Sequence, residues 1–478
     1  MRENTGGDDA GSQREPPATD DAASRTLKQS ETPSDSRRLT HWQVFLLAGP
    51  IMVSNATTPL GGYVDTAVIG RLGSETLMGA VAVSAIIFNQ IYWIFGFLRM
   101  GTTGFTAQAH GAEDWDEVAA FLGRAMSIAV ACGLLLVTAQ AAVSALAFWL
   151  MSASDGVTSS ALTYFQIRIW GAPAALINFA LVGWFIGLGR AHIAFVLQLI
   201  LNLTNMALAI LFVLVASWGV AGVGLAILVA EITAAIIGVV LAWRTLNANG
   251  ARVLLNRIAD PRQLKRMFVV NGDIMIRTFC LLLAFGMFTR EGAQAGDLTL
   301  AINALLFSIA MIATYLLDGF AFAAETFVGK AVGARAPDRF DEAIRMTTIW
   351  AGVVACAMAA AILFGGGWMI DLAATNPEIR EGARAYLWWA ALVPLVGVWC
   401  FQLDGIFIGA TQSRDMRNMM LISFAVFLVA AFTLTEVFGN DGLWLALYVF
   451  FIVRAVTLYA RLPALKRTVF RTQHTTAL

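Results

Sequence analysis

The fold is decided by residues 42–70, WQVFLLAGPIMVSNATTPLGGYVDTAVIG. This run is apolar and longer than the roughly 20 helical residues that cross a bilayer. Its one charged residue is Asp65. An ionised carboxylate in hydrocarbon costs at least ~2.5–3.5 kcal/mol, so Asp65 should face a partner, a cavity or water. Proline removes a backbone donor and glycine lacks a side chain, so both make a helix easier to bend. Four such hinge candidates lie in this run: Pro50, Pro59, Gly61 and Gly62.

The composition is that of a polytopic membrane protein. Of the 478 residues, 58% are hydrophobic and 13% are charged, whereas soluble domains carry about 25% charged residues. Lysine plus arginine and aspartate plus glutamate each number 32, so the net charge gives no indication of a nucleic-acid partner. The four cysteines lie in apolar runs without metal-ligand or redox spacing, and we expect neither a metal site nor a cofactor.

Apolar runs divide the chain into twelve predicted spans. They are roughly 42–70, 76–109, 117–150, 160–189, 191–216, 219–243, 264–289, 297–331, 340–370, 380–410, 416–438 and 442–460. We therefore expect an all-α membrane protein with two lobes of six spans. The predicted segments are a disordered cytoplasmic tail (1–40), an N-lobe (41–244), a cytoplasmic linker (245–262), a C-lobe (263–461) and a cytoplasmic C-terminal tail (462–478). Residues 1–40 are too polar to bury a core.

Basic residues indicate the orientation of the spans. Seventeen lysines and arginines fall in one set of connections, at 37–38, 190, 244–266, 330–339, 414–417 and 461–467. The opposite set holds four: Arg71, Arg290, Arg380 and Arg384. Because cytoplasmic connections carry the excess of positive charge, we predict that both termini are cytoplasmic.

The chain also repeats itself. GWFIGLGR at 183–190 matches GIFIGATQ at 405–412, an offset of 222 positions. GAEDWDEV at 111–118 falls on GARAPDRF at 333–340 at the same offset. Internal repeats are typical of transporters that bind substrate near the bilayer midplane between two halves. Since both halves hold six spans and begin on the same side, we predict a parallel repeat about an axis along the membrane normal.

These stretches resemble the multidrug and toxic compound extrusion (MATE) family, and its bacterial DinF-like branch in particular. The resemblance covers about 42–460. The matching stretches are PLGGYVDTAVIGRLG at 59–73, GTTGFTAQAHGA at 101–112, GWFIGLGR at 183–190, Arg277-Thr278, LLDGFAFAAETFVGKAVGA at 316–334 and DGIFIGAT at 404–411. The resemblance implies two six-helix bundles that form a V in the bacterial inner membrane. It also implies export of organic, often cationic, compounds in exchange for H+ or Na+.

One departure from the family concerns the N-lobe site. Members often carry a second aspartate in the fifth span, four residues after an asparagine, whereas here Ala209 follows Asn205. The site would then rest mainly on Asp65. Neutral amides are its candidate hydrogen-bond partners or cavity residues: Asn55, Asn178, Asn202 and Asn205.

Asp65 is our candidate for the proton-coupling site. Burial favours the neutral form of a carboxyl group and nearby donors favour the ionised form, so an acid between these influences can bind and release a proton. We hypothesise that protonation of Asp65 favours bending near 59–62. The alternative is a buried aspartate that caps a broken helix. We favour H+ over Na+ because the N-lobe shows one acid and hard cations prefer several oxygen ligands, although carbonyl and asparagine oxygens could complete a Na+ site.

Polar residues also lie within the predicted spans of the C-lobe. They are Arg277, Asn303, Asp318, Glu325 and Asp404. Asp318 and Glu325 are seven residues apart and therefore share one face of a helix. These residues either contact substrate or a cation, or form a structural network in which Arg277 pairs with an acid, since charges inside membranes usually pair with one another.

We predict a secondary antiporter that exports lipophilic or cationic organic compounds by alternating access and works as a monomer among membrane lipids. The sequence contains no ATP-binding motif, so an ion gradient should supply the energy. The alternatives are a Na+-coupled exporter and a flippase for lipids or amphiphiles, which would need a cationic cavity. No HExxH or Ser/His pattern indicates an enzyme, and a passive channel would not explain the duplicated lobes.

Overall fold

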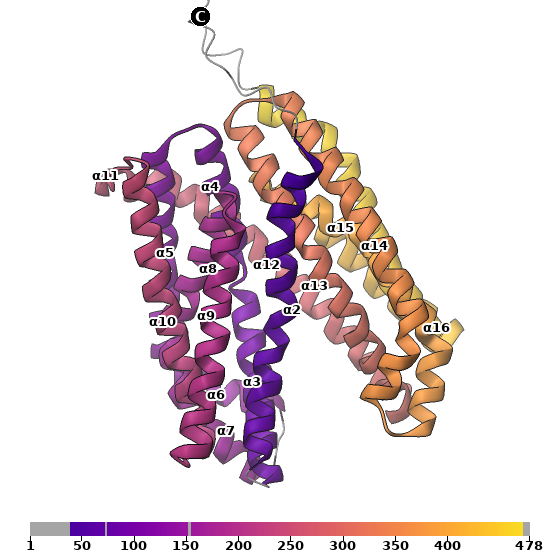
Figure 1. The fold of residues 1–478 in the computed structure, drawn as a ribbon. Coiled ribbons are helices and arrows are strands. Elements are labelled where there is room, and N and C mark those ends of the chain that lie inside the picture. The colour runs from indigo at the N-terminus through magenta and orange to yellow at the C-terminus, as the bar shows by residue number, and fades with distance from the viewer. Residues whose placement is uncertain (1–38, 72–73, 152–153, 472–478) are drawn as a thin grey trace, which may run out of the picture. The chain divides into compact units, whose positions relative to one another are not determined.

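The structure, a computed structural model, describes residues 39–71, 74–151 and 154–471, without the side chains of 56–64, 66 and 471. These ranges are helical and contain no strand. The helices are α2 (His41–Gly70), α3 (Glu75–Ile94), α4 (Phe97–Gly111), α5 (Trp115–Thr138), α6 (Gln140–Met151), α7 (Asp155–Arg168), α8 (Ala172–Gly187), α9 (Ala191–Ile210), α10 (Gly219–Ala248), α11 (Leu255–Ile258), α12 (Pro261–Gln294), α13 (Asp297–Gly333), α14 (Pro337–Ala373), α15 (Pro377–Gly409) and α16 (Ser413–Arg471) (Figure 1). Most of the predicted tail 1–40 and the end of the C-terminal tail lie outside the described residues.

The described helices make twelve passes, as predicted. Ten helical segments are long and apolar enough to cross a membrane; two of them join labelled helices, α3 with α4 and α7 with α8. One of these, α16, reverses direction at Gly439, where φ is +58°. Asp415 and Arg461 form an ion pair of 2.9 Å between the two arms, although a straight helix would hold them about 70 Å apart. The reversal adds one pass, and α2, with 30 residues, adds the other.

Local sequence explains where several helices begin. Thr40 and Gln43 form a capping box at the start of α2, in which each side chain bonds the backbone of the other. Asp114 accepts a hydrogen bond from the Glu117 amide at the start of α5. Such caps satisfy amides that have no partner within the helix. Helices α12, α14 and α15 each begin with proline, whose missing N–H costs nothing at that position.

The predicted repeat is visible in the backbone. Four helices of the first half begin 222 positions before four of the second, at Glu75 and Asp297, Trp115 and Pro337, Asp155 and Pro377, and Ala191 and Ser413. Three turns with positive φ recur at the same offset: Glu113 and Arg335, Gly189 and Thr411, and Ser217 and Gly439. Since residues other than glycine seldom adopt positive φ, this agreement shows that both halves share one fold.

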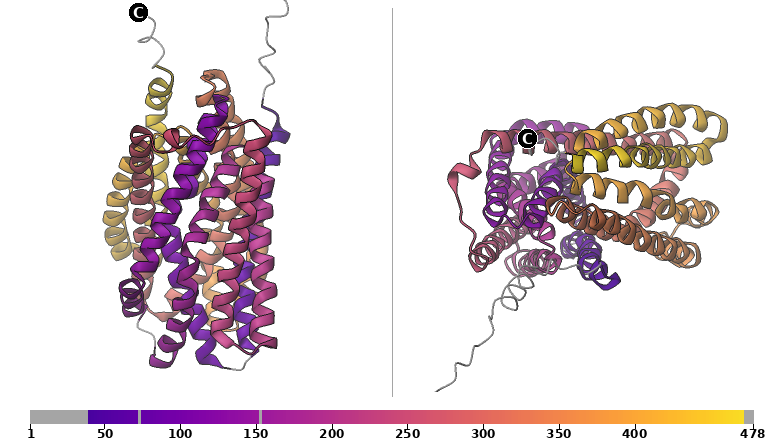
Figure 2. Two further views of the ribbon diagram at one scale, coloured as in Figure 1. Left: turned by 90° about the vertical axis from the view of Figure 1, so that its left-hand side faces the viewer. Right: turned by 90° about the horizontal axis from the view of Figure 1, so that it is seen from above.

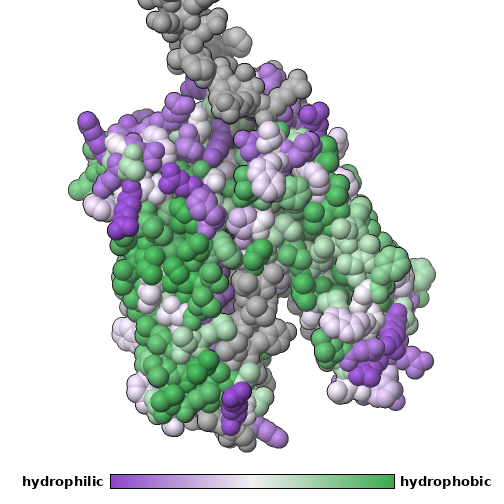
Figure 3. All heavy atoms as spheres, viewed as in Figure 1, coloured by the Kyte–Doolittle hydropathy of each residue, from purple (hydrophilic) through white to green (hydrophobic). Residues whose placement is uncertain are grey.

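The two halves form two bundles. Helices α2–α10 lie on one side and α12–α16 on the other, as Figure 2 shows from above. One hydrophobic core runs through the first bundle and continues into the adjoining parts of α12–α16, whereas a second core is confined to α12–α16. The bundles meet at the end that carries α11. Figure 3 shows a hollow between them at the opposite end.

The segment around α11 is fastened to the first bundle. Arg257 is 2.9 Å from both carboxylate oxygens of Asp114, and this hydrogen bond raises the pKa of the Arg257 guanidinium. The backbone amide of Arg252 donates to Asp116 at 2.7 Å. The fully buried Arg124 of α5 donates to the carbonyl of Ile258 in α11 at 3.3 Å. This linker therefore belongs structurally to the α2–α10 bundle.

Helices α4 and α13 cross at the contact between the bundles, which we call the seam. A Cβ atom on Gly111 would overlap the Lys330 carbonyl, and one on Gly333 would overlap the Gln108 carbonyl. These two approaches are related by the 222-residue repeat. Polar bonds across the seam add to the packing: Gln108 Nε2 to the Gly409 carbonyl, Thr326 Oγ1 to the Ile186 carbonyl and Lys330 Nζ to the Leu188 carbonyl, each 2.9 Å.

The close packing of Gly333 against the Gln108 carbonyl predicts that Gly333→Ala destabilises the closed seam. The added methyl group would meet backbone, which cannot move aside as a side chain can, and overpacking of this kind costs about 1–3 kcal/mol. Gly352→Ala in α14 is the matched control because nothing lies within 4 Å of its Cβ position. We expect a lower thermal-unfolding midpoint in detergent for Gly333→Ala and an equal or higher one for Gly352→Ala. Equal midpoints for Gly333→Ala and wild type would contradict this account of the seam.

Candidate functional site

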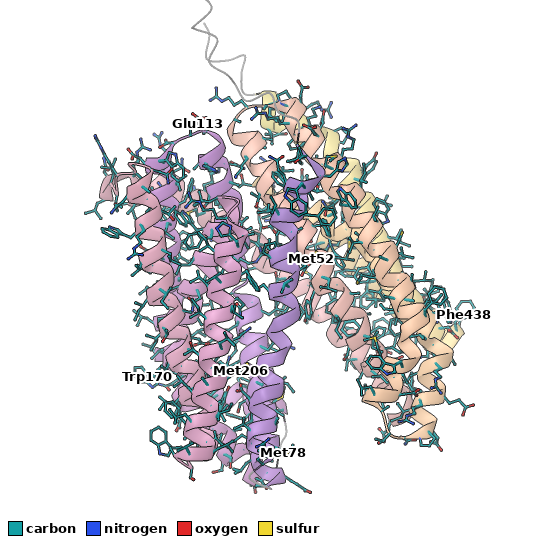
Figure 4. The ribbon with its side chains drawn as sticks, viewed as in Figure 1. Met52, Met78, Glu113, Trp170, Met206 and Phe438 are labelled. Atoms are coloured by element: carbon teal, nitrogen blue, oxygen red, sulfur yellow. The ribbon has the colours of Figure 1, made fainter. Side chains whose placement is uncertain are left out.

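Asp65 lies in the interior of the first bundle, as a carboxylate on a membrane helix should. It is 9% exposed. Its Oδ1 accepts a hydrogen bond from Nδ2 of Asn205 in α9 at 3.1 Å. Helix α2 packs against both α9 and α13. Figure 4 marks Met52 on α2, and a Cβ atom on Gly319 of α13 would lie 2.6 Å from its side chain. The helix that carries Asp65 thus touches both bundles.

The other three candidate amides have different partners. Asn178 Nδ2 donates to the backbone carbonyl of Glu231 at 2.9 Å. Asn202 accepts a hydrogen bond from Gln198 at 3.2 Å. Asn55 Nδ2 donates to the carbonyl of Tyr315 at 2.9 Å, which joins α2 to α13. Asn205 is therefore the amide that the structure brings to Asp65.

The expectation of a single acid in the N-lobe interior is wrong. Glu231 of α10 is 4% exposed, and its Oε1 is 3.9 Å from Arg168. Arg168 also donates to the hydroxyl of Tyr164 at 2.9 Å and lies over the ring of Phe88, 4.5 Å from its centroid. Glu231 is the one charge in residues 219–243, so the argument used for Asp65 could have found it.

Several buried oxygens in this bundle accept no hydrogen bond from the described residues. They are Asn178 Oδ1, Asn205 Oδ1 and Glu231 Oε2. A buried acceptor without a donor carries a desolvation cost, which a proton on a carboxylate, a water molecule or a small cation would relieve. Within the described ranges, no group of three or more His, Cys, Asp or Glu residues is placed to hold a metal ion. The bundle interior therefore offers carboxylates that can take up a proton and amide oxygens that can accept further hydrogen bonds.

Arg277 and Asp404 form an ion pair in the C-lobe, and a second arginine, Arg454 of α16, binds the same carboxylate. All three residues are buried. Arg454 is the one charge in residues 442–460, but it was not among the candidates predicted from the sequence. This arrangement agrees with the structural charge network, which was one of the two interpretations of these residues.

The remaining C-lobe candidates occupy two places. Asn303 Oδ1 accepts hydrogen bonds from Asn440 Nδ2 at 3.1 Å and from Trp444 Nε1 at 3.0 Å, so it joins α13 to α16. Asp318 and Glu325 lie on α13. Glu325 forms an ion pair of 3.3 Å with Arg99 of α4, across the seam.

The hinge candidates lie in a helix that is continuous in this structure. Helix α2 runs without a break from His41 to Gly70, through Pro50, Pro59, Gly61 and Gly62. The side chains of residues 56–64 lie outside the described part of the chain. Bending of α2 on protonation therefore stays a prediction.

A duplicated chain of twelve membrane helices, with charged residues buried inside both bundles, defines a multi-pass membrane transporter. The MatE family model matches residues 50–211 and 274–433, one segment in each half. The chain belongs to the MatE family, whose members are transporters rather than enzymes.

Relatives cover nearly the same length of chain. The protein is 37% identical over 414 residues to "DNA damage-inducible protein F" of Escherichia coli strain K12, which covers 87% of this chain and 90% of the relative. It is 25% identical over 461 residues to "Probable multidrug resistance protein NorM" of Agrobacterium fabrum, covering 90% and 96%. A solved structure described as an outward-facing multidrug resistance MATE family transporter aligns with a TM-score of 0.79 at 18% identity, covering 89% and 96%. At that identity the likeness concerns the fold alone.

Proposed function

We propose that this protein is a secondary antiporter that exports lipophilic or cationic organic compounds in exchange for protons, with Asp65 as the proton-coupling site. The observation that carries the proposal is a buried carboxylate on α2 that accepts a hydrogen bond from Asn205. An amide can donate to an ionised carboxylate and can accept from a protonated one after it rotates. Asn205 can therefore stabilise both states of the acid.

The position of α2 connects proton binding to the arrangement of the bundles. The helix packs on α9 of one bundle and on α13 of the other, so a change at Asp65 acts on an element that both bundles contact. If protonation weakens substrate binding, substrate binding must favour release of the proton to the same extent, because linkage is reciprocal. This coupling would drive export with the proton gradient of the bacterial inner membrane.

Alternating access agrees with the contacts between the bundles. Glycines and polar bonds close the seam at the end near α11, where the basic connections lie, and the bundles diverge at the other end (Figure 3). With both termini placed in the cytoplasm, this state opens outward. The relative from Agrobacterium fabrum, described as a probable multidrug resistance protein, supports organic compounds as substrates.

Na+ is the second candidate for the coupling ion. Hard cations prefer several oxygen ligands, and the first bundle holds Glu231 as a second buried acid. Buried amide oxygens of Asn178 and Asn205 accept no bond from the described residues. Protons stay the first choice because an acid with a single amide donor suffices to bind one.

Transport in proteoliposomes tests the coupling ion. Purified protein would face either a pH gradient or a Na+ gradient while ethidium, a fluorescent organic cation, is followed. We expect the pH gradient alone to drive ethidium movement. Ethidium movement under the Na+ gradient alone would indicate Na+ coupling, with an ion site that includes Glu231 and the amide oxygens of Asn178 and Asn205. Movement under neither gradient would contradict the antiporter, and a lipid-headgroup scrambling assay would then test the flippase alternative.

A further inference from the structure

Arg99 of α4 lies at the seam and reaches across to α13. Its guanidinium lies over the ring of Phe322, with Cζ 3.6 Å from the ring centroid, and its Nη1 is 3.3 Å from Oε2 of Glu325. The Glu325 side chain is 2% exposed and that of Arg99 is 13% exposed. Asp318, one turn before Phe322 on the same face, also interacts electrostatically with Arg99. A cation is therefore held on an aromatic ring that lies between two acids.

This face of α13 leads from the hollow to the seam. Helix α13 begins at the end where the bundles diverge and finishes toward the end of the molecule that carries α11 (Figure 1). Along it, Tyr315 is 37% exposed, Asp318 is half-buried and Glu325 is buried. We call Asp318, Phe322 and Glu325 the α13 acidic face. A molecule in the hollow would meet its Asp318 end first.

The internal repeat shows that this contact is not part of the symmetric packing. Gly183 closely approaches the carbonyl of Arg99, and Gly405 approaches that of Ala321 in the same way, so positions 99 and 321 have equivalent backbone environments. Only the first carries a charge. The N-lobe equivalents of the acidic face are neutral: Gly96, Met100 and Thr103. The shared fold therefore does not require the cation or the two acids.

We propose that the α13 acidic face is a binding subsite for the cationic group of an exported organic cation, and that Arg99 occupies this subsite while the seam is closed. The ligand it would take has a delocalised or quaternary positive charge beside apolar surface, because such a cation can stack on an aromatic ring. The inference rests on the proposed function, since it assigns the substrate a place in the transport cycle.

Arg99 gives the subsite a means of release. When the bundles part at the seam, Arg99 leaves with α4 and Glu325 loses its ion-pair partner. Arg277 of the same bundle attracts both acids electrostatically, but its ion pair is with Asp404. The departure of Arg99 therefore favours another cation at the two acids. When the seam closes, Arg99 returns and displaces the bound cation toward the hollow. The subsite is then open to the substrate cation only while the seam is open.

Equilibrium binding of ethidium to the purified full-length protein tests the subsite without any ion gradient. Arg99→Met removes the internal competitor and keeps a side chain of similar length. An internal competitor lowers apparent affinity in proportion to the fraction of molecules it occupies. We expect Kd for ethidium to fall about tenfold in Arg99→Met. Adding Glu325→Gln to this variant should reverse the gain, because the partner of the cation is lost.

Lys330→Met is the matched control. Lys330 also bridges the seam from α13, but its Nζ bonds the carbonyl of Leu188 at 2.9 Å and does not touch the acidic face. A general loosening of the seam would lower Kd equally in both variants, and that result would overturn the subsite. An unchanged or weaker Kd in Arg99→Met with a monodisperse size-exclusion profile would overturn it too. If Arg99→Met does not purify, Arg99→Gln should show a smaller change in the same direction.

The outcome is separable from proton coupling. The gain in affinity should persist when Asp65→Asn is combined with Arg99→Met, because the acidic face lies on α13 and needs no proton at Asp65. If no pH-driven transport is found but Arg99→Met still binds ethidium more tightly, the subsite is supported and the proton antiporter is not. If pH-driven transport is found but Arg99→Met shows no gain in ethidium affinity, the antiporter is supported and the subsite is not.

Discussion

Asp65→Asn is expected to reduce ethidium movement under a pH gradient to the level of protein-free liposomes. Asparagine has nearly the shape of aspartate and can still bond Asn205, but it cannot bind and release a proton. The loss should therefore be one of coupling, with the fold retained. Fluorescence of ethidium in proteoliposomes under an imposed pH gradient measures the effect. The same variant should bind ethidium at equilibrium, which checks that the protein is intact.

Glu231→Gln is the matched variant, since it also removes a buried acid from the first bundle. Glu231 forms an ion pair with Arg168 at 3.9 Å. Asp65 accepts a hydrogen bond from the neutral amide of Asn205 and interacts with Arg168 electrostatically without an ion pair. We expect Glu231→Gln to keep measurable pH-driven transport. Wild-type transport in Asp65→Asn together with loss in Glu231→Gln would transfer the proton site to Glu231. Wild-type transport in both variants would leave the N-lobe acids without a coupling role.

The membrane architecture could be predicted from the sequence because its signals are local or repeated. Each apolar run that is long enough to cross a bilayer predicts one pass. The stretch GWFIGLGR at 183–190 has its counterpart at 405–412, which reveals the repeat. The turn at Ser217 and its counterpart at Gly439 show the same offset in the backbone. Asn205 was one of four candidate partners for Asp65, and the structure was needed to choose among them.

The charge partners could not be predicted because they depend on how helices rotate and pack. Arg99 and Glu325 are separated by 226 positions and by the seam, so no pattern along either helix reveals their contact. Asp404 illustrates the same limit. Its partner Arg277 was a candidate, but the second arginine comes from the last pass, and only packing shows that one carboxylate serves two guanidinium groups.

The Asp404 network predicts the largest change in stability. Asp404→Ala would leave Arg277 and Arg454 buried beside each other with no carboxylate between them. Removing one partner from a buried ion pair costs about 3–5 kcal/mol, because the remaining charge is left unpaired. We expect little accumulation of Asp404→Ala in membranes and a strongly lowered unfolding midpoint in detergent.

Asp415→Ala is the control that distinguishes the loss of a buried ion pair from the loss of an exposed one. Asp415 is also paired with an arginine, Arg461, at 2.9 Å, but their side chains are 21% and 47% exposed. Exposed pairs contribute about 0–1 kcal/mol, so this variant should unfold near the wild-type midpoint. Replacing Asp404, Arg277 and Arg454 together with apolar residues should recover part of the stability that Asp404→Ala loses, since the two arginines are then no longer buried without their carboxylate. If Asp404→Ala is as stable as Asp415→Ala, the buried network does not stabilise the fold.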